Sequence, residues 1–189
     1  RGFDSVVFHA RGVSGGTVME ELINEGMFCG VLDLTTTEIA DMIAGGIYPS
    51  ERTRLDYLGK IPAIIAPGAL DMVNFGSPDT VPQKYLNRQF VRHGMATTLM
   101  RTSSSELKQA AEFIALKANN ASKCRILLPR NGFSSYDSDG HEFYNMAADN
   151  VFIDTLCQLS NNAAVVPMHI NDPDFASLAV SALINLMEG

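Results

Sequence analysis

The stretch DSVVFHARGVSGGTVMEELINE, residues 4–25, decides the fold class of this chain. Residues 4–10 are mostly apolar, as in a buried strand, and the apolar residues of 17–25 recur at helical spacing. A glycine-rich turn joins the two, and a second apolar strand is predicted at 28–34. Strand, crossover helix and strand together form the repeating unit of a parallel sheet.

The rest of the chain continues this alternation. Further strands are predicted at 61–66, 97–101, 124–128 and 163–168, and helices between Thr37 and Gly45 and at 50–58, 103–118, 145–160 and 174–187. The predicted fold is an α/β, Rossmann-like three-layer sandwich with a mostly parallel sheet, in a single domain over residues 1–189. Ligands of such sheets bind beyond the carboxyl ends of the strands.

The composition of the chain indicates which kinds of partner and which cellular location to expect. The net charge of −7 and the isoelectric point near 5.0 disfavour nucleic acid and anionic membranes as partners. Three widely spaced cysteines without a CxxC pair indicate neither a disulfide framework nor a zinc site, and they fit reduced thiols in a cytoplasmic protein. The sequence predicts neither a membrane span, since it has no apolar run of about 18 residues, nor a leader peptide.

The glycine-rich turn is the first candidate binding site. Backbone N–H groups can converge there, and the positive end of the following helix adds to their attraction for phosphate. The predicted nucleotide-binding residues of this turn are His9, Gly12, Ser14, Gly15, Gly16 and Thr17. The turn matches neither GxxxxGK[ST] nor GxGxxG. A tight turn that requires small residues explains the glycines equally well.

Hydroxyl-bearing residues after the second strand form another candidate site. Asp33 lies near the end of the strand predicted at 28–34, and Thr35, Thr36 and Thr37 follow it. Such hydroxyls and the adjacent amides suit a phosphate or a hydrated Mg²⁺ ion. The alternative is that one threonine caps the next helix while the others are solvated.

Two further strand ends carry candidate residues. The loop after 61–66 mixes apolar residues with Asp71 and Asn74, which favours a wall for a flat ring such as a base. Burial of this loop under a neighbouring domain is the alternative. Arg101 ends the strand at 97–101 and Thr102 follows it. Arg101 is a candidate phosphate partner. A helix cap explains at least one of the nearby hydroxyls.

The first turn also contains the pattern GxSxG around Ser14, which is typical of the nucleophile elbow of a hydrolase. His169 follows the last predicted strand, and Asp137 or Asp139 could complete a triad in the order serine, acid, histidine. Against this reading, the elbow would lie on the first strand, with no earlier strand or oxyanion loop before it.

Several segments together resemble one known family. They are VFHA at 7–10, MEEL at 19–22, GVLDLTTTE at 30–38, PGALDMVNFG at 67–76, MRT at 100–102 and LPRNG at 128–132. This set resembles the ATP-binding-domain family of the tomato mosaic virus resistance protein. The resemblance implies an ATP-binding domain that forms the carboxyl-terminal half of a two-part Rossmann-like region, with the amino-terminal half as a partner. It implies no established reaction.

The sequence as a whole favours a domain that binds a nucleotide, namely ATP, with Mg²⁺ as a further candidate cofactor and no demonstrable reaction of its own. A serine hydrolase is the second hypothesis, and a protein-interaction module is the third. The apolar loop around Asp71 and the nine methionines favour a homodimer, which a sedimentation mass above 20.5 kDa would support.

Overall fold

A parallel sheet forms the centre of the computed structural model, which describes residues 2–9 and 13–189, the side chains of residues 13 and 14 excepted. Its strands are β1 (Val31–Thr35), β2 (Ala63–Gly68), β6 (Cys124–Pro129) and β7 (Ala163–Val166), in the order β1-β2-β6-β7. Every pairing in this sheet is parallel. Among the described strands β1 pairs with β2 alone, so β1 is an edge strand.

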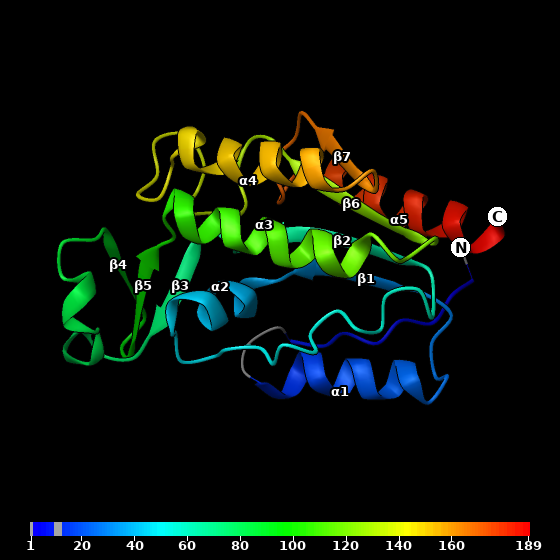
Figure 1. The fold of residues 1–189 in the computed structure, drawn as a ribbon, viewed down its shortest axis with the longest axis horizontal. Helices are drawn as coiled ribbons and strands as arrows, with labels where there is room; N and C mark the ends of the chain where they lie inside the picture. The colour runs from blue at the N-terminus through cyan, green and yellow to red at the C-terminus, as the bar shows by residue number, and fades with distance from the viewer. Residues whose placement is uncertain (1, 10–12) are drawn as a thin grey trace.

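Helices cover both faces of the sheet (Figure 1). They are α1 (Val13–Asn24), α2 (Thr37–Ala44), α3 (Ser104–Ala118), α4 (Met146–Leu159) and α5 (Pro173–Glu188). Ile64 and Ala66 of β2 point toward Phe175 of α5, while Ala63 and Ile65 point into the larger core under the other helices. Because side chains alternate along a strand, β2 is apolar on both faces. The predicted three-layer sandwich is confirmed.

A second, smaller sheet lies at one end of the molecule (Figure 1). Its strands are β3 (Met72–Phe75), β4 (Phe90–His93) and β5 (Thr97–Arg101), antiparallel in the order β3-β5-β4. Short 3₁₀ turns at Pro78–Thr80 and Gln83–Tyr85 connect β3 to β4. The strand predicted at 97–101 therefore exists, but it belongs to this sheet and not to the parallel one.

Two predicted elements are wrong. Residues 2–9 have no regular secondary structure, so the described part of the strand predicted at 4–10 is not formed. Residues 50–58 form a series of turns and not a helix. Leu55, which is buried, has a positive φ of 72°, and a left-handed residue ends a helical path.

Within the described part of the chain, no helix is long and apolar enough to cross a membrane.

Candidate functional site

Two neighbouring cavities lie between α1, β1 and the turns at 49–60. The larger has a volume of about 590 Å³ and is bounded by residues 3–9, by β1 and by the second half of α5. The smaller, of about 330 Å³, lies between α1 and the turns. Gly16, Glu38 and Arg54 line both cavities, so these three residues stand where the two meet.

Arg54 is the centre of this region and holds three carboxylates. Both of its terminal nitrogens lie 2.7 Å from oxygens of Asp33, its Nε lies 2.7 Å from Glu38 Oε1, and Nη1 lies 2.9 Å from Glu20 Oε1. The guanidinium is only 5% exposed. Since the carboxylates come from α1, β1 and α2, the side chain of Arg54 ties three elements together. The pKa of Arg54 is raised, chiefly because the neighbouring carboxylates outweigh the effect of its own burial.

The three carboxylates around Arg54 have unequal surroundings. Asp33 also accepts a hydrogen bond from the Tyr57 hydroxyl at 2.9 Å, and Glu20 accepts one from the Leu55 N–H at 2.9 Å. Glu38 Oε2 is buried and has no hydrogen-bond partner among the described residues. Burial raises the pKa of Glu38 to about 7 even though Arg54 opposes the shift. Glu38 is therefore less readily ionised than an ordinary glutamate.

The larger cavity has an apolar part and a polar part. Its apolar lining consists of Phe3, Val6, Val7, Phe8, Met19, Phe28, Val180, Leu183, Ile184 and Met187. Its polar lining includes His9, Thr35 and the Glu38–Arg54 pair. Gly16 lies in the first turn of α1, where a helix carries backbone N–H groups without an intrahelical partner. The cavity can therefore accommodate a ligand with a flat apolar ring and an anionic end.

Five of the residues predicted from the sequence meet at these cavities. His9, Gly16, Asp33 and Thr35 line the larger cavity, and Gly16 and Thr17 line the smaller one. At Gly15 a Cβ atom would lie 1.8 Å from the His9 carbonyl oxygen, so a close backbone approach requires glycine there. Gly12 and the side chain of Ser14 lie outside the described residues.

Three other predicted residues lie instead at the junction of α2 with the sheets. Thr36 is buried, and its hydroxyl donates to the Ala66 carbonyl at 3.2 Å. Asn74 donates through Nδ2 to Thr37 Oγ1 at 3.3 Å and through its backbone N–H to Asp41 Oδ1 at 2.7 Å. These polar groups connect the start of α2 to β2 and β3.

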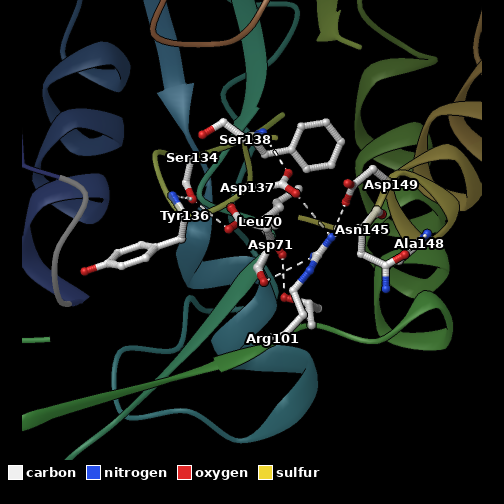
Figure 2. Close-up of polar contacts among 12 residues, drawn as sticks. Leu70, Asp71, Arg101, Ser134, Tyr136, Asp137, Ser138, Asn145, Ala148 and Asp149 are labelled. Carbon is white, nitrogen blue, oxygen red and sulfur yellow. Dashed lines mark hydrogen bonds and ion pairs between the residues drawn. The ribbon is translucent and has the colours of Figure 1, made fainter. Parts of the chain in front are cut away.

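The remaining predicted residues are Asp71, Arg101 and Thr102, all of which are buried. Asp71 and Arg101 lie in a separate cluster of polar side chains (Figure 2). Arg101 Nη2 lies 2.5 Å from Asp149 Oδ1 and 3.6 Å from Asp137 Oδ1, and its Nη1 donates to the Asp71 carbonyl at 3.2 Å. Ser134 Oγ donates to Asp71 Oδ2 at 2.7 Å. We call Asp71, Arg101, Asp137 and Asp149 the buried aspartate cluster. Thr102 joins it to the backbone by donating to the Leu70 carbonyl at 2.6 Å.

Burial dominates the ionisation of the buried aspartate cluster. It raises the pKa of Asp71 to about 7, with the Asp137 charge adding to the shift. It raises the pKa of Asp149 to about 8 against the opposing effect of Arg101, and the pKa of Asp137 is raised as well. One guanidinium contacts two of the three carboxyl groups, and this excess of acidic groups over the cation favours retention of a proton in the cluster.

The stability of the protein is expected to fall as the pH rises from 6 to 9. The pKa of such a carboxyl group is higher in the folded chain than in the unfolded chain. Its contribution to stability is fully present below the unfolded pKa and is lost as the pH rises through the folded pKa. For Asp149 the folded pKa is about 8. In Asp149→Asn the loss over this range should shrink by on the order of 2 kcal/mol. Urea unfolding at each pH measures it.

The matched control is Asp154→Asn, which removes an exposed carboxylate of the same helix and should leave the pH dependence unchanged. An Asp149→Asn protein that keeps the full pH dependence would contradict the assignment.

Two of the partners considered for a hydrolase triad, His169 and Asp137, are engaged elsewhere. His169 Nδ1 accepts the Asn171 N–H at 3.1 Å, so the proton is on Nε2, which lies 2.9 Å from the Ser134 carbonyl oxygen. Asp137 accepts the Phe133 N–H at 2.9 Å and faces Arg101. Both nitrogens of the predicted base are therefore engaged, Nε2 with the loop after β6 and Nδ1 with the loop after β7 that carries His169.

Sequence reasoning missed the residues that organise both regions. Arg54 and Tyr57 belong to no short motif, and Glu20 and Glu38 appear only within the segments that carry the family resemblance. Thr36 occupies the amino-terminal cap position of α2, but its side chain makes no cap hydrogen bond. The side chain of Glu38 accepts a hydrogen bond from Arg54. Ser134 and Asp149 likewise lie in segments where polar residues are ordinary, and Asp137 was considered only as the acid of a hydrolase triad.

Comparison with known proteins assigns a family. A family model described as the C-terminal domain of an uncharacterised protein family, UPF0261, matches residues 1–187. The chain belongs to the UPF0261 C-terminal domain family. This UPF0261 domain is 41% identical over 194 residues to the ToMV resistance protein Tm-1(GCR237) of Solanum lycopersicum, covering 98% of the chain and 26% of the tomato protein.

Bacterial relatives of the UPF0261 domain are equally similar. UPF0261 protein RA0729 of Rhizobium meliloti is 41% identical over 187 residues, covering 95% of this chain and 47% of the relative. A UPF0261 protein of Clostridium tetani is 40% identical over 194 residues, covering 99% and 48%. The chain thus spans about half the length of these bacterial relatives and about a quarter of the tomato protein.

Proposed function

We propose that this UPF0261 domain binds a nucleotide, ATP, in the larger cavity and catalyses no reaction by itself. The observation that carries the proposal is the combination, in one cavity, of an apolar wall with the first turn of α1. A volume of about 590 Å³ is in the usual range for small-molecule sites. The apolar side chains of α5 and residues 3–8 suit a base, and the amides at the start of a helix suit phosphate.

The charge of the cavity supports binding of ATP with Mg²⁺ and not of free ATP. Asp33 lines the larger cavity and Glu20 lines the smaller one beside it, so these two carboxylates already outnumber Arg54, and a triphosphate would add further negative charge. Mg²⁺ bound to the phosphates would neutralise part of that charge. Among the described residues no group of His, Cys, Asp or Glu could hold a metal ion. We therefore infer that Mg²⁺ enters with the nucleotide.

The test substitutes Gly16, where the two cavities meet. A Cβ atom there would lie 3.5 Å from Arg54 Nε, an ordinary contact, so the backbone tolerates a side chain. The branched side chain of Gly16→Val would extend into the cavity and should weaken Mg-ATP binding at least tenfold, about 1.4 kcal/mol. Isothermal titration calorimetry measures the affinity, with MgCl₂ or with EDTA, and EDTA should weaken binding to the unchanged protein.

Ser104→Val is the matched control, because it places the same side chain in the exposed first turn of α3, away from both cavities. Circular dichroism checks that each variant is folded. A folded Gly16→Val protein that binds Mg-ATP as tightly as the unchanged chain would remove this cavity from the proposal.

A further inference from the structure

The open edge of β1 lies beside an apolar segment that precedes α1. Residues 3–8 line the larger cavity together with β1 and α5, and none of them makes a backbone hydrogen bond with the described part of the chain. Val6 and Val7 are 64% and 91% exposed. Figure 1 shows the segment running in the same direction as β1. Folded proteins normally cover exposed apolar side chains that lie beside an unpaired strand edge.

The backbone hydrogen bonds of the parallel sheet follow one rule of direction. Residues whose side chains face the larger core donate their N–H toward the next strand in the order β1-β2-β6-β7. These bonds run from Val31 to the Pro62 carbonyl at 3.0 Å, from Ala63 to the Lys123 carbonyl at 2.9 Å, and from Ile126 to the Asn162 carbonyl at 2.8 Å. Successive residues of a strand point their backbone groups to opposite sides. Leu32, whose side chain packs on the α5 side, therefore directs its N–H and C=O to the open edge.

The contact of Phe8 determines how residues 4–8 can fit this edge. Phe8 packs against the larger core, with its ring 5.8 Å from that of Phe28. In a strand that keeps this contact, Val6 lies on the same face as Phe8 and Val7 faces α5, because side chains alternate. The direction rule of the sheet then makes Val6 donate its N–H to β1, while the N–H of Val7 points away from the sheet.

We propose that residues 4–8 form a strap that closes onto β1 as a fifth, parallel strand of the main sheet. α1 then serves as the crossover helix that two parallel neighbours require. Closure pairs the backbone of the strap with the open edge and places Val7 against α5, where Val180 is 41% exposed and lines the same cavity. The closed strap fills the part of the larger cavity next to β1, so a ligand there competes with it. This inference concerns the protein without ligand and goes beyond the proposed function.

The experiment measures amide hydrogen exchange by NMR, residue by residue, in the protein without ligand. Hydrogen-bonded amides exchange only when the structure around them opens, so closure should slow the Leu32 and Val6 amides at least about tenfold relative to an unstructured peptide. The Val7 amide, which points away from the sheet, should exchange freely. Protection of Val6 without protection of Val7 distinguishes a strand from a compact loop.

Val6→Pro and Val7→Pro form a matched pair, because the same replacement is made at adjacent positions. Val6→Pro removes the N–H that donates to β1 and should abolish the protection of Leu32. Val7→Pro removes an N–H that points outward, which an edge strand tolerates, and should retain that protection. Both residues are exposed in the structure, so neither variant should unfold the domain, and urea unfolding checks this.

The outcomes either support the strap or overturn it. Protection of Leu32 that is lost in Val6→Pro and kept in Val7→Pro supports it. Free exchange of Leu32 in the unchanged protein, or equal loss in the two variants, would overturn it. Protection that persists in Val6→Pro would also overturn it, and a rise with protein concentration would then assign the edge to a second copy of the chain. None of these results depends on Mg-ATP, so the strap and the proposed function can fail separately.

Discussion

An Arg101→Met protein is expected to unfold with a free energy about 3–5 kcal/mol lower than that of the unchanged chain. Methionine has a similar reach but no charge, so Asp137 and Asp149 would lose the cation that contacts them. The Asp71 carbonyl would lose a hydrogen bond as well. Urea unfolding at pH 7, followed by circular dichroism, measures the difference.

Arg92→Met is the matched control, since it removes an exposed arginine of β4 in the same small sheet. Its effect should stay within about 0.5 kcal/mol. Arg101→Lys, which keeps a positive charge, should recover part of the lost stability. A loss below about 1 kcal/mol in Arg101→Met would show that the buried aspartate cluster tolerates the absence of its cation.

Arg54→Met is expected to have an effect of similar size, about 3–5 kcal/mol at pH 8. It leaves Asp33, Glu20 and Glu38 facing one another without the guanidinium that joins α1, β1 and α2. The loss should be smaller at pH 5, because protonation of the carboxyl groups removes part of their mutual repulsion. Urea unfolding at the two pH values measures both effects.

Arg52→Met serves as the control for this substitution, because Arg52 is an exposed residue of the same series of turns. It should change the stability by no more than about 0.5 kcal/mol. An Arg54→Met protein whose loss of stability is equal at pH 5 and pH 8 would contradict the electrostatic origin of the effect.

The sequence predicts the parallel sheet well because local pattern and tertiary environment agree there. The strands β2 and β6 are short runs that are apolar and buried on both faces, apart from the exposed Arg125 of β6, and segments with helical spacing lie between them in the chain. The turns at 50–58 could not be predicted in the same way. Leu55 in these turns adopts a positive φ, and its N–H donates a hydrogen bond to the side chain of Glu20. Glu20 lies 35 residues away in the chain, so this contact, which fixes the path of the turns, leaves no local signal in the sequence.

The small antiparallel sheet shows a related limit of sequence analysis. β5 is an apolar strand whose own residues do not reveal whether its neighbours run parallel or antiparallel to it. β3 lies inside a segment that reads as a loop, since its four residues follow a sharp turn and include Asn74. The pairing of β3 with β5 depends on residues more than 20 positions away in the chain.

Candidate site residues could be predicted by their place at strand ends but not by their use. Asp33, Thr35 and Gly16 line the cavities, whereas Thr36 and Thr37 make hydrogen bonds within the protein. Arg101 was considered as a phosphate partner, and the carboxylate it contacts is 48 residues further along the chain. A sequence shows that a charged residue is present, but its partner is set by the fold.

The two cavities share Gly16, Glu38 and Arg54, so their occupants cannot act independently. A small molecule in the cavity beside α1 that alters the contact between Glu38 and Arg54 would also alter the surface that the larger cavity presents to the proposed nucleotide. Thermodynamic reciprocity would then require the proposed nucleotide to change the affinity of that small molecule by the same factor. The shared wall therefore makes this domain a natural place for cooperative or competitive binding between two unlike ligands.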